Sequence, residues 1–86
     1  MTRILKSVQV KYFAVLREQA NLSEERVEVA ADCRTYGELY ALLKEKHSFT
    51  LPLKMIQVAV DDRFASLDHE IRESARVVFI PPMAGG

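Results

Sequence analysis

A single segment of the chain carries a strong helix signal, and strand-like patterns flank it on both sides. Thr35 and Glu38 match a capping box, in which each side chain accepts a hydrogen bond from the other residue's backbone N–H. With 86 residues and one main helix, the chain has room for one domain with one core. Apolar residues recur at three- and four-residue spacing, with Leu42 beside them, which predicts one stripe facing a sheet: Tyr36, Leu39, Tyr40, Leu43 and His47.

Before this helix the sequence predicts two strands. Residues 7–13 alternate between polar and apolar side chains, and residues 26–29 do so again. Between them, residues 14–20 are rich in helix formers and residues 21–25 are polar, which predicts a helical turn and a loop. The two strands are close enough to form an antiparallel pair. The first should place Gln9, Lys11 and Phe13 on the face opposite Val8, Val10 and Tyr12.

Three more strands are expected after the helix. Residues 56–60 predict the third strand, Asp61-Asp62 a turn, and residues 63–65 a short fourth strand. Residues 68–74 form a polar connector with room for a helical turn. Residues 76–80 are almost entirely apolar, which favours a central strand with both faces covered.

This order of elements is typical of a two-layer α+β domain. If the first and last strands pair at the centre of a mixed sheet, the fold is the β-grasp of ubiquitin. The order alone leaves that pairing open. The predicted domain covers residues 1–80, and residues 81–86 form a flexible tail.

Charge balance and the short apolar runs exclude two classes of partner. Twelve Lys and Arg balance twelve Asp and Glu, so no basic excess is available for nucleic acid. The apolar runs fall far short of the ~20 residues that a membrane-spanning helix needs. Cys33 is the only cysteine, which rules out an internal disulfide and fits a reducing compartment. We expect a cytoplasmic protein with neither nucleic acid nor a membrane as partner.

The last six residues have the composition of a projecting tail. Pro81-Pro82 cannot donate to a sheet and fix φ, so they should end the last strand as a stiff, extended segment. The next four residues reach at most about 14 Å, far enough to enter a partner's active site. Gly85-Gly86 lack Cβ atoms, so a narrow channel can admit them. We expect the terminal carboxylate of Gly86 to react; a frayed end without function is the alternative.

Motifs at both ends of the chain resemble those of a known family. The run Val10 to Ala14, continued by Arg17-Glu18, and the ending Phe79 to Gly86 resemble the small, sulfur-carrying subunits of molybdopterin synthase. The resemblance covers essentially the whole chain. The Phe-X-Pro-Pro-X-X-Gly-Gly ending is the discriminating part, because Gly-Gly alone also ends ubiquitin-like modifiers and the thiazole-pathway sulfur carrier.

This resemblance implies a β-grasp protein that binds no cofactor of its own. An E1-like enzyme would use ATP to adenylate Gly86, which would then become a thiocarboxylate. The tail would enter the large subunit of molybdopterin synthase and give sulfur to cyclic pyranopterin monophosphate, a pterin substrate reached only through the complex. The activity belongs to that complex, which in the family is a heterotetramer.

The resemblance also implies a docking surface for the large subunit. Phe64 and Ile80 match partner-contacting positions of the family, Arg17 matches a polar contact, and Phe13 points to the outer face of the first strand. The alternative is that the apolar residues belong to the core and that Arg17 is solvated. The remaining implied partner-binding residues are those of the tail: Pro82, Met83, Ala84 and Gly85.

Two positions depart from the family's pattern. Its members commonly have an Asp-Gly-Asp turn where this chain has Glu73-Ser74-Ala75, and an asparagine where this chain has Asp61. The loss of a glycine suited to positive φ leaves the geometry of that turn open. Neither change touches the tail.

Other residues carry weaker signals. Cys33 precedes the helix start, where a thiol pKa can fall, but no base is apparent nearby, so a passive cysteine is favoured. His47 and His69 lack ligand spacing, which argues against a metal site. Gly37 is interpreted as a packing or capping residue. No nucleophile, base and acid converge, which favours a carrier over a self-sufficient enzyme.

Two functions of other classes stay open. One is a ubiquitin-like modifier that forms isopeptide bonds with lysines of other proteins. The other is a plain binding module whose tail is incidental. A sulfur carrier of another pathway, such as thiazole synthesis, would share the chemistry of Gly86.

Overall fold

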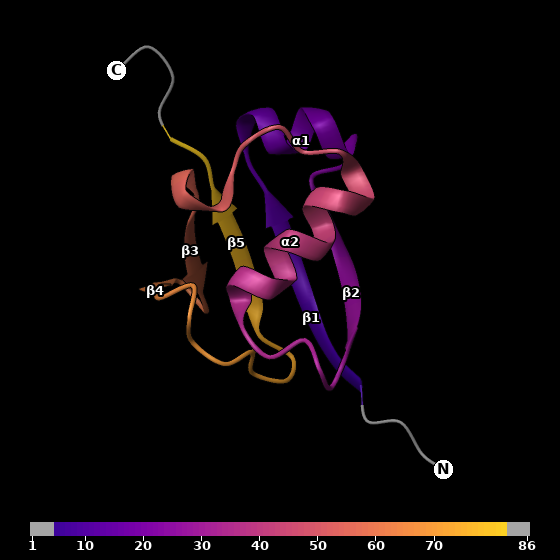
Figure 1. Cartoon of the computed structure of the whole chain (residues 1–86), viewed down its shortest axis with the longest axis vertical. Coiled ribbons are helices and arrows are strands. Elements are labelled where there is room, and N and C mark those ends of the chain that lie inside the picture. Colours follow the sequence, from indigo (N-terminus) through magenta and orange to yellow (C-terminus); the bar gives the residue numbers. More distant parts are fainter. Residues whose placement is uncertain (1–4, 83–86) are drawn as a thin grey trace.

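The computed structural model describes residues 5–82. One long helix, α2, crosses one face of the sheet, so the domain has two layers (Figure 1). The elements follow in the order β1 (Leu5–Tyr12), α1 (Ala14–Ala20), β2 (Glu24–Ala30), α2 (Tyr36–His47), η1 (Leu53–Met55), β3 (Gln57–Val60), β4 (Arg63–Ala65) and β5 (Arg76–Ile80).

The five strands form one mixed sheet in the order β2-β1-β5-β3-β4. The first and last strands, β1 and β5, lie side by side at its centre and run parallel, with Tyr12 opposite Phe79. The other neighbours are antiparallel. This pairing confirms the α+β, β-grasp fold that the order of elements had left open.

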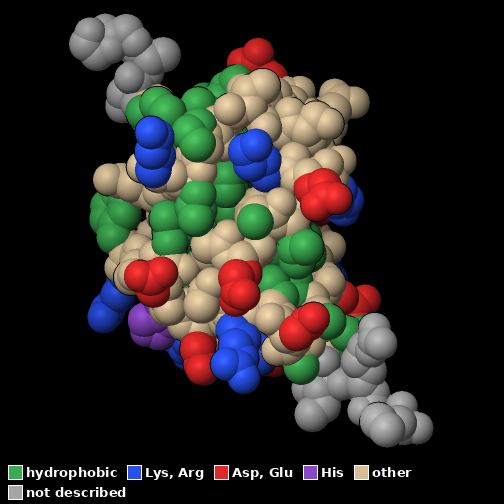
Figure 2. Space-filling model, in the orientation of Figure 1, with side chains coloured by type: hydrophobic (Ala, Val, Ile, Leu, Met, Phe, Trp, Pro, Cys, Tyr) green, Lys and Arg blue, Asp and Glu red, His purple; other side chains and the backbone are tan. Residues whose placement is uncertain are grey.

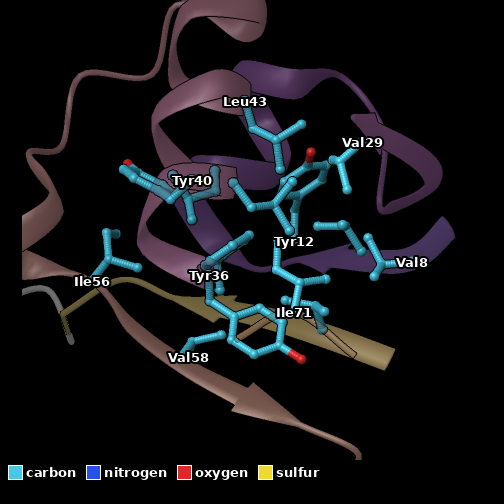
Figure 3. Close-up of a cluster of buried hydrophobic side chains, with 14 of the residues drawn as sticks. Val8, Tyr12, Val29, Tyr36, Tyr40, Leu43, Ile56, Val58 and Ile71 are labelled. Atoms are coloured by element: carbon cyan, nitrogen blue, oxygen red, sulfur yellow. The ribbon is translucent and has the colours of Figure 1, made fainter. Parts of the chain in front are cut away.

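The core lies between the sheet and α2. Val8, Val10 and Tyr12 face it from β1, as the alternation predicts, and each is at most 1% exposed. Tyr36, Tyr40 and Leu43 meet them from α2 (Figure 3). Leu39 of the same helix is also buried.

The start of α2 is fixed in the way the sequence predicts. Thr35 Oγ1 accepts a hydrogen bond from Glu38 N at 3.1 Å, and Glu38 Oε1 accepts one from Thr35 N at 3.0 Å. This confirms the capping box. Gly37 is a packing residue, because a Cβ there would lie 3.2 Å from the carbonyl oxygen of Leu67.

Some boundaries differ from the predictions. β2 begins at Glu24, so the loop expected at residues 21–25 is shorter than predicted. Ile56 precedes β3 instead of opening it. Residues 68–74 contain turns and an isolated bridge between Thr35 and Glu70, with no helical turn.

The prediction that both faces of the last strand are covered is wrong. Val77 and Phe79 are buried under α2, but Val78 and Ile80 on the other face are only partly buried. Leu42 also lies outside the core, because it is 51% exposed on α2. Apolar content alone does not reveal whether a second layer covers a strand.

The turn before β5 keeps a left-handed residue without a glycine. Ser74 has φ 63°, and its backbone N–H donates to the carbonyl of Ser7 at 2.7 Å. The β3–β4 turn behaves similarly, with φ 51° at Asp61 and 72° at Asp62. The geometry expected of glycine is therefore retained by serine and aspartate at a cost in backbone energy.

Candidate functional site

The open face of the sheet, opposite α2, carries a hollow of about 490 Å³. Apolar side chains from three strands and from the start of α1 line it: Phe13, Ala59, Phe64, Val78 and Ile80. The structure therefore brings together Phe13, Phe64 and Ile80, which the sequence had singled out from three distant segments.

Strand register explains the shape of this hollow. Val78 of β5 lies between Lys11 of β1 and Ala59 of β3, and Ala59 is opposite Phe64 of β4. Because side chains alternate between the faces of a sheet, this row points away from α2. The small Ala59 sits between two larger neighbours, which leaves a depression.

Phe13 forms one wall of the hollow and is 43% exposed. It is the N-cap residue of α1, and its carbonyl accepts from Leu16 N at 3.1 Å. The ammonium of Lys11 lies 5.4 Å from the centre of its ring, within cation–π range. The first contact fixes the backbone of Phe13 at the start of α1, and the second involves its exposed ring.

Phe64 forms the opposite wall and is the most exposed large apolar residue of the described chain, at 74%. Its short strand is held by the preceding turn, which is tied to the central strand. Asp61 N donates to Arg76 O at 2.8 Å, and Asp61 Oδ1 accepts from Arg76 N at 2.9 Å. An exposed aromatic on a braced edge strand is typical of a binding surface.

Charged residues surround the apolar centre in balanced numbers. Lys11, Glu24, Asp62 and Arg76 lie in the lining of the hollow, and Arg76 Nη2 contacts Asp62 Oδ2 at 3.1 Å. The hollow is therefore an apolar patch with a polar rim, which is the arrangement of protein–protein interfaces.

The chain leaves the sheet next to this hollow. β5 ends at Ile80, Pro81 is buried and Pro82 is exposed, so the strand stops where the sequence predicts. Arg17 is exposed on α1 and does not line the hollow. The other predicted site residues lie outside the described residues: Met83, Ala84, Gly85 and Gly86.

A polar cluster that sequence reasoning missed supports the strand that leads into Phe13. Glu25 receives a hydrogen bond from the Tyr12 hydroxyl at 2.5 Å and contacts Lys46 Nζ at 2.9 Å. The oxygen that accepts from Tyr12 also lies 2.7 Å from His47 Nε2. The cluster joins β1, β2 and the end of α2. Glu25 is paired with Val10 in the sheet, and side chains alternate between the two faces of a strand. This alternation is the one sequence signal that could have placed Glu25 on the core side.

The ionisation of this cluster follows from its contacts. Partial burial acts to raise the pKa of Glu25, but hydrogen bonds from Tyr12, Lys46 and His47 outweigh it and lower the pKa to about 2. Burial, and then the contact with Glu25, raise the pKa of Tyr12 far above its ordinary value. Glu25 is therefore an anion at neutral pH and Tyr12 a neutral donor.

Cys33 is buried, and that burial raises the pKa of its thiol, with a further contribution from Glu38 and Asp32. A neutral thiol is a poor nucleophile, which agrees with a passive role. Within residues 5–82, no group of three or more His, Cys, Asp and Glu side chains could hold a metal ion. No helix in the same part of the chain is long and apolar enough to cross a membrane.

Comparison with known proteins gives matches along most of the chain. Residues 10–86 match the ThiS family. The chain is 30% identical over 82 residues to the molybdopterin synthase sulfur carrier subunit of Escherichia coli K12. This alignment covers 92% of this chain and 99% of that protein.

Solved structures of other proteins have the same fold. SAMP1 from Haloferax volcanii superposes with a TM-score of 0.73 at 26% identity, covering 93% of this chain and 99% of that chain. A chain in the complex of subunits 1 and 2 of the molybdopterin-converting factor from Helicobacter pylori 26695 superposes with a TM-score of 0.58 at 25% identity. This superposition covers 93% of this chain and 99% of that chain.

Proposed function

The chain belongs to the ThiS family, and we propose that it is the sulfur-carrier subunit of a molybdopterin synthase, with Gly86 as its carrier group. The position of the apolar hollow carries this proposal. Ile80 lines the hollow and is followed directly by the Pro-Pro-Met-Ala-Gly-Gly ending. A partner that covers the hollow therefore meets the segment that leads to the reactive terminus.

The chemistry of a terminal carboxylate requires activation before sulfur can be attached. An α-carboxylate, with an ordinary pKa of about 3.3–3.7, is ionised at neutral pH and is a poor electrophile. An E1-like enzyme would join Gly86 to the AMP portion of ATP and release pyrophosphate. Sulfide-level sulfur, as hydrosulfide, would then attack the carbonyl carbon of Gly86 and displace AMP, so that the bond to the phosphate oxygen breaks as the C–S bond of the thiocarboxylate forms. That sulfur is the atom delivered to cyclic pyranopterin monophosphate.

Docking of the body must support insertion of the tail. Ordering four residues costs about 4–8 kcal/mol at ~1–2 kcal/mol each. Full burial of three exposed side chains would contribute about 5–9 kcal/mol at ~1.5–3 kcal/mol each. Phe13, Phe64 and Ile80 contribute less than this sum, because Phe13 is 43% exposed and Ile80 is already partly buried. The exposure of Phe13 and Phe64 leaves this surface available in the isolated domain.

The relatives support a large subunit as the docking partner. The Helicobacter pylori structure is a protein–protein complex of two subunits of the molybdopterin-converting factor, and one of its chains shares this fold. We infer that the hollow contacts the corresponding large subunit and that Arg17, which is exposed on α1 one helical turn after Phe13, contributes a polar contact outside the hollow.

Complementation tests this function. A strain that lacks its own small synthase subunit should regain molybdopterin synthesis with the full chain and should fail to do so when Gly86 is deleted. Leu42→Ala, at an exposed position of α2, is the matched control and should restore synthesis. Undiminished synthesis without Gly86 would leave a plain binding module as the function.

A ubiquitin-like modifier is the second candidate, and the likeness to SAMP1, the small archaeal modifier protein 1 of Haloferax volcanii, favours keeping it. Both functions need an activated Gly86, so the deletion does not separate them. Branched Gly-Gly peptides on lysines of cellular proteins would support the modifier.

A further inference from the structure

A second groove, of about 360 Å³, lies beside the end of β5. We call it the stem groove. Figure 1 shows the short turn η1 next to the point where the chain leaves β5. Ile80 lines both the stem groove and the hollow, so the two are contiguous. The lining of the stem groove consists of Lys54, Met55, Ile56, Gln57, Ile80, Pro81 and Pro82.

The stem groove has a fixed frame and an exposed apolar side chain. The backbone N–H of Met55 donates to Pro52 O, and that of Ile56 donates to Leu53 O, each at 3.0 Å. Ile56 is 4% exposed and anchors the turn in the core, whereas Met55 is 43% exposed. Figure 2 shows apolar side chains and a basic one gathered next to the grey chain end at the upper left.

We propose that the stem groove is a second contact site for the large synthase subunit, with an apolar residue of that partner against Met55 and an acidic one near Lys54. The inference rests on the function proposed above. Lys54 is the one charged residue among the described residues that line the groove, so charge complementarity favours an acidic partner group.

The reach of the tail, with Gly86 as the proposed carrier group, brings the partner close to this groove. Four residues follow Pro82. At ~3.3–3.6 Å per residue they span at most about 14 Å, so a reaction centre that acts on Gly86 lies within that distance of Pro82. A folded partner that encloses these residues must approach the surface around Pro82, and the stem groove is part of that surface.

Binding measurements with the full chain and the large subunit from the same organism test the inference. Met55→Ala should raise the dissociation constant about tenfold, as expected when an apolar anchor residue of an interface is truncated. Leu42→Ala is the matched control, since Leu42 is also an exposed apolar residue, and should change it less than twofold. Lys54→Glu should slow association at low salt, while Arg34→Glu, the same change in charge at another exposed position, should not.

Two failures are distinguishable. If the wild-type chain binds the large subunit and Met55→Ala binds as tightly as Leu42→Ala, the stem groove is not part of the interface and the inference alone is wrong. Unchanged amide NMR signals of residues 54–57 on complex formation would lead to the same conclusion. If the wild-type chain does not bind the large subunit at all, the proposed function fails as well.

Discussion

The hydroxyl of Tyr12 donates a hydrogen bond to Glu25 Oε2 at 2.5 Å, linking the inner face of β1 to β2. Tyr12 is 1% exposed, and its neighbour Phe13 is 43% exposed. Because adjacent residues of an extended chain point to opposite sides, the anchoring of Tyr12 in the core directs Phe13 into the hollow on the open face. The polar cluster and the hollow are thus joined through a single peptide unit.

Removal of the Glu25 carboxylate should destabilise the domain. Glu25→Ala leaves the buried Tyr12 hydroxyl without its acceptor and removes the contacts with Lys46 and His47, so we expect a loss of about 2–3 kcal/mol in the free energy of unfolding. Glu28→Ala, at an exposed position of the same strand, should change it by less than about 0.5 kcal/mol. Urea unfolding measures both. Equal effects of the two variants would contradict the role of the cluster.

The contribution of Glu25 should depend on pH. Its pKa falls from an ordinary 4.5 to about 2 in the folded chain. A folded pKa below the unfolded one gives stability that is present above pH 4.5 and is lost as the pH falls toward 2. The difference in unfolding free energy between wild type and Glu25→Ala should therefore shrink over this range. A difference that stays constant down to pH 2 would show that the anion is not stabilised.

Ser74→Gly should stabilise the domain by roughly 0.5–1 kcal/mol, because serine pays for a left-handed backbone that glycine adopts freely. The backbone N–H of residue 74, which donates to Ser7 O, is retained. Ser23→Gly, at a position without positive φ, should give no gain. Thermal unfolding of the three proteins measures this, and a lower midpoint for Ser74→Gly than for wild type would count against the interpretation.

Phe64→Ala should weaken binding of the large subunit about tenfold while leaving stability unchanged, since the side chain is 74% exposed. Leu5→Ala is the control, because Leu5 is exposed at the start of β1 and does not line the hollow. Calorimetric titration gives the affinities. Wild-type affinity for Phe64→Ala would exclude this wall of the hollow from the interface.

Local patterns predicted the main helix and the two faces of the first strand correctly. The capping box fixed the start of α2, and alternation assigned the two faces of β1 correctly. The Pro-Pro pair marked the end of β5. These features depend on interactions between residues close in sequence, so a local sequence pattern is enough to predict them.

Long-range contacts account for what the sequence did not reveal. Glu24 and Glu25 resembled loop residues, but Glu25 is satisfied by Tyr12, Lys46 and His47, which lie 13, 21 and 22 positions away. The apolar sequence of the last strand predicted that Val78 would be buried, but Val78 lies on the open face of the sheet and is only partly buried. The hollow became visible only when strand register placed Phe64 beside Ala59.

The mass of the intact chain isolated from its own cells tests the central claim most directly. We predict a population in which one oxygen atom of the Gly86 carboxylate is replaced by sulfur, and its disappearance when the E1-like enzyme is deleted. A chain that carries only oxygen at this carboxylate, in cells that are making molybdopterin, would contradict the sulfur-carrier function.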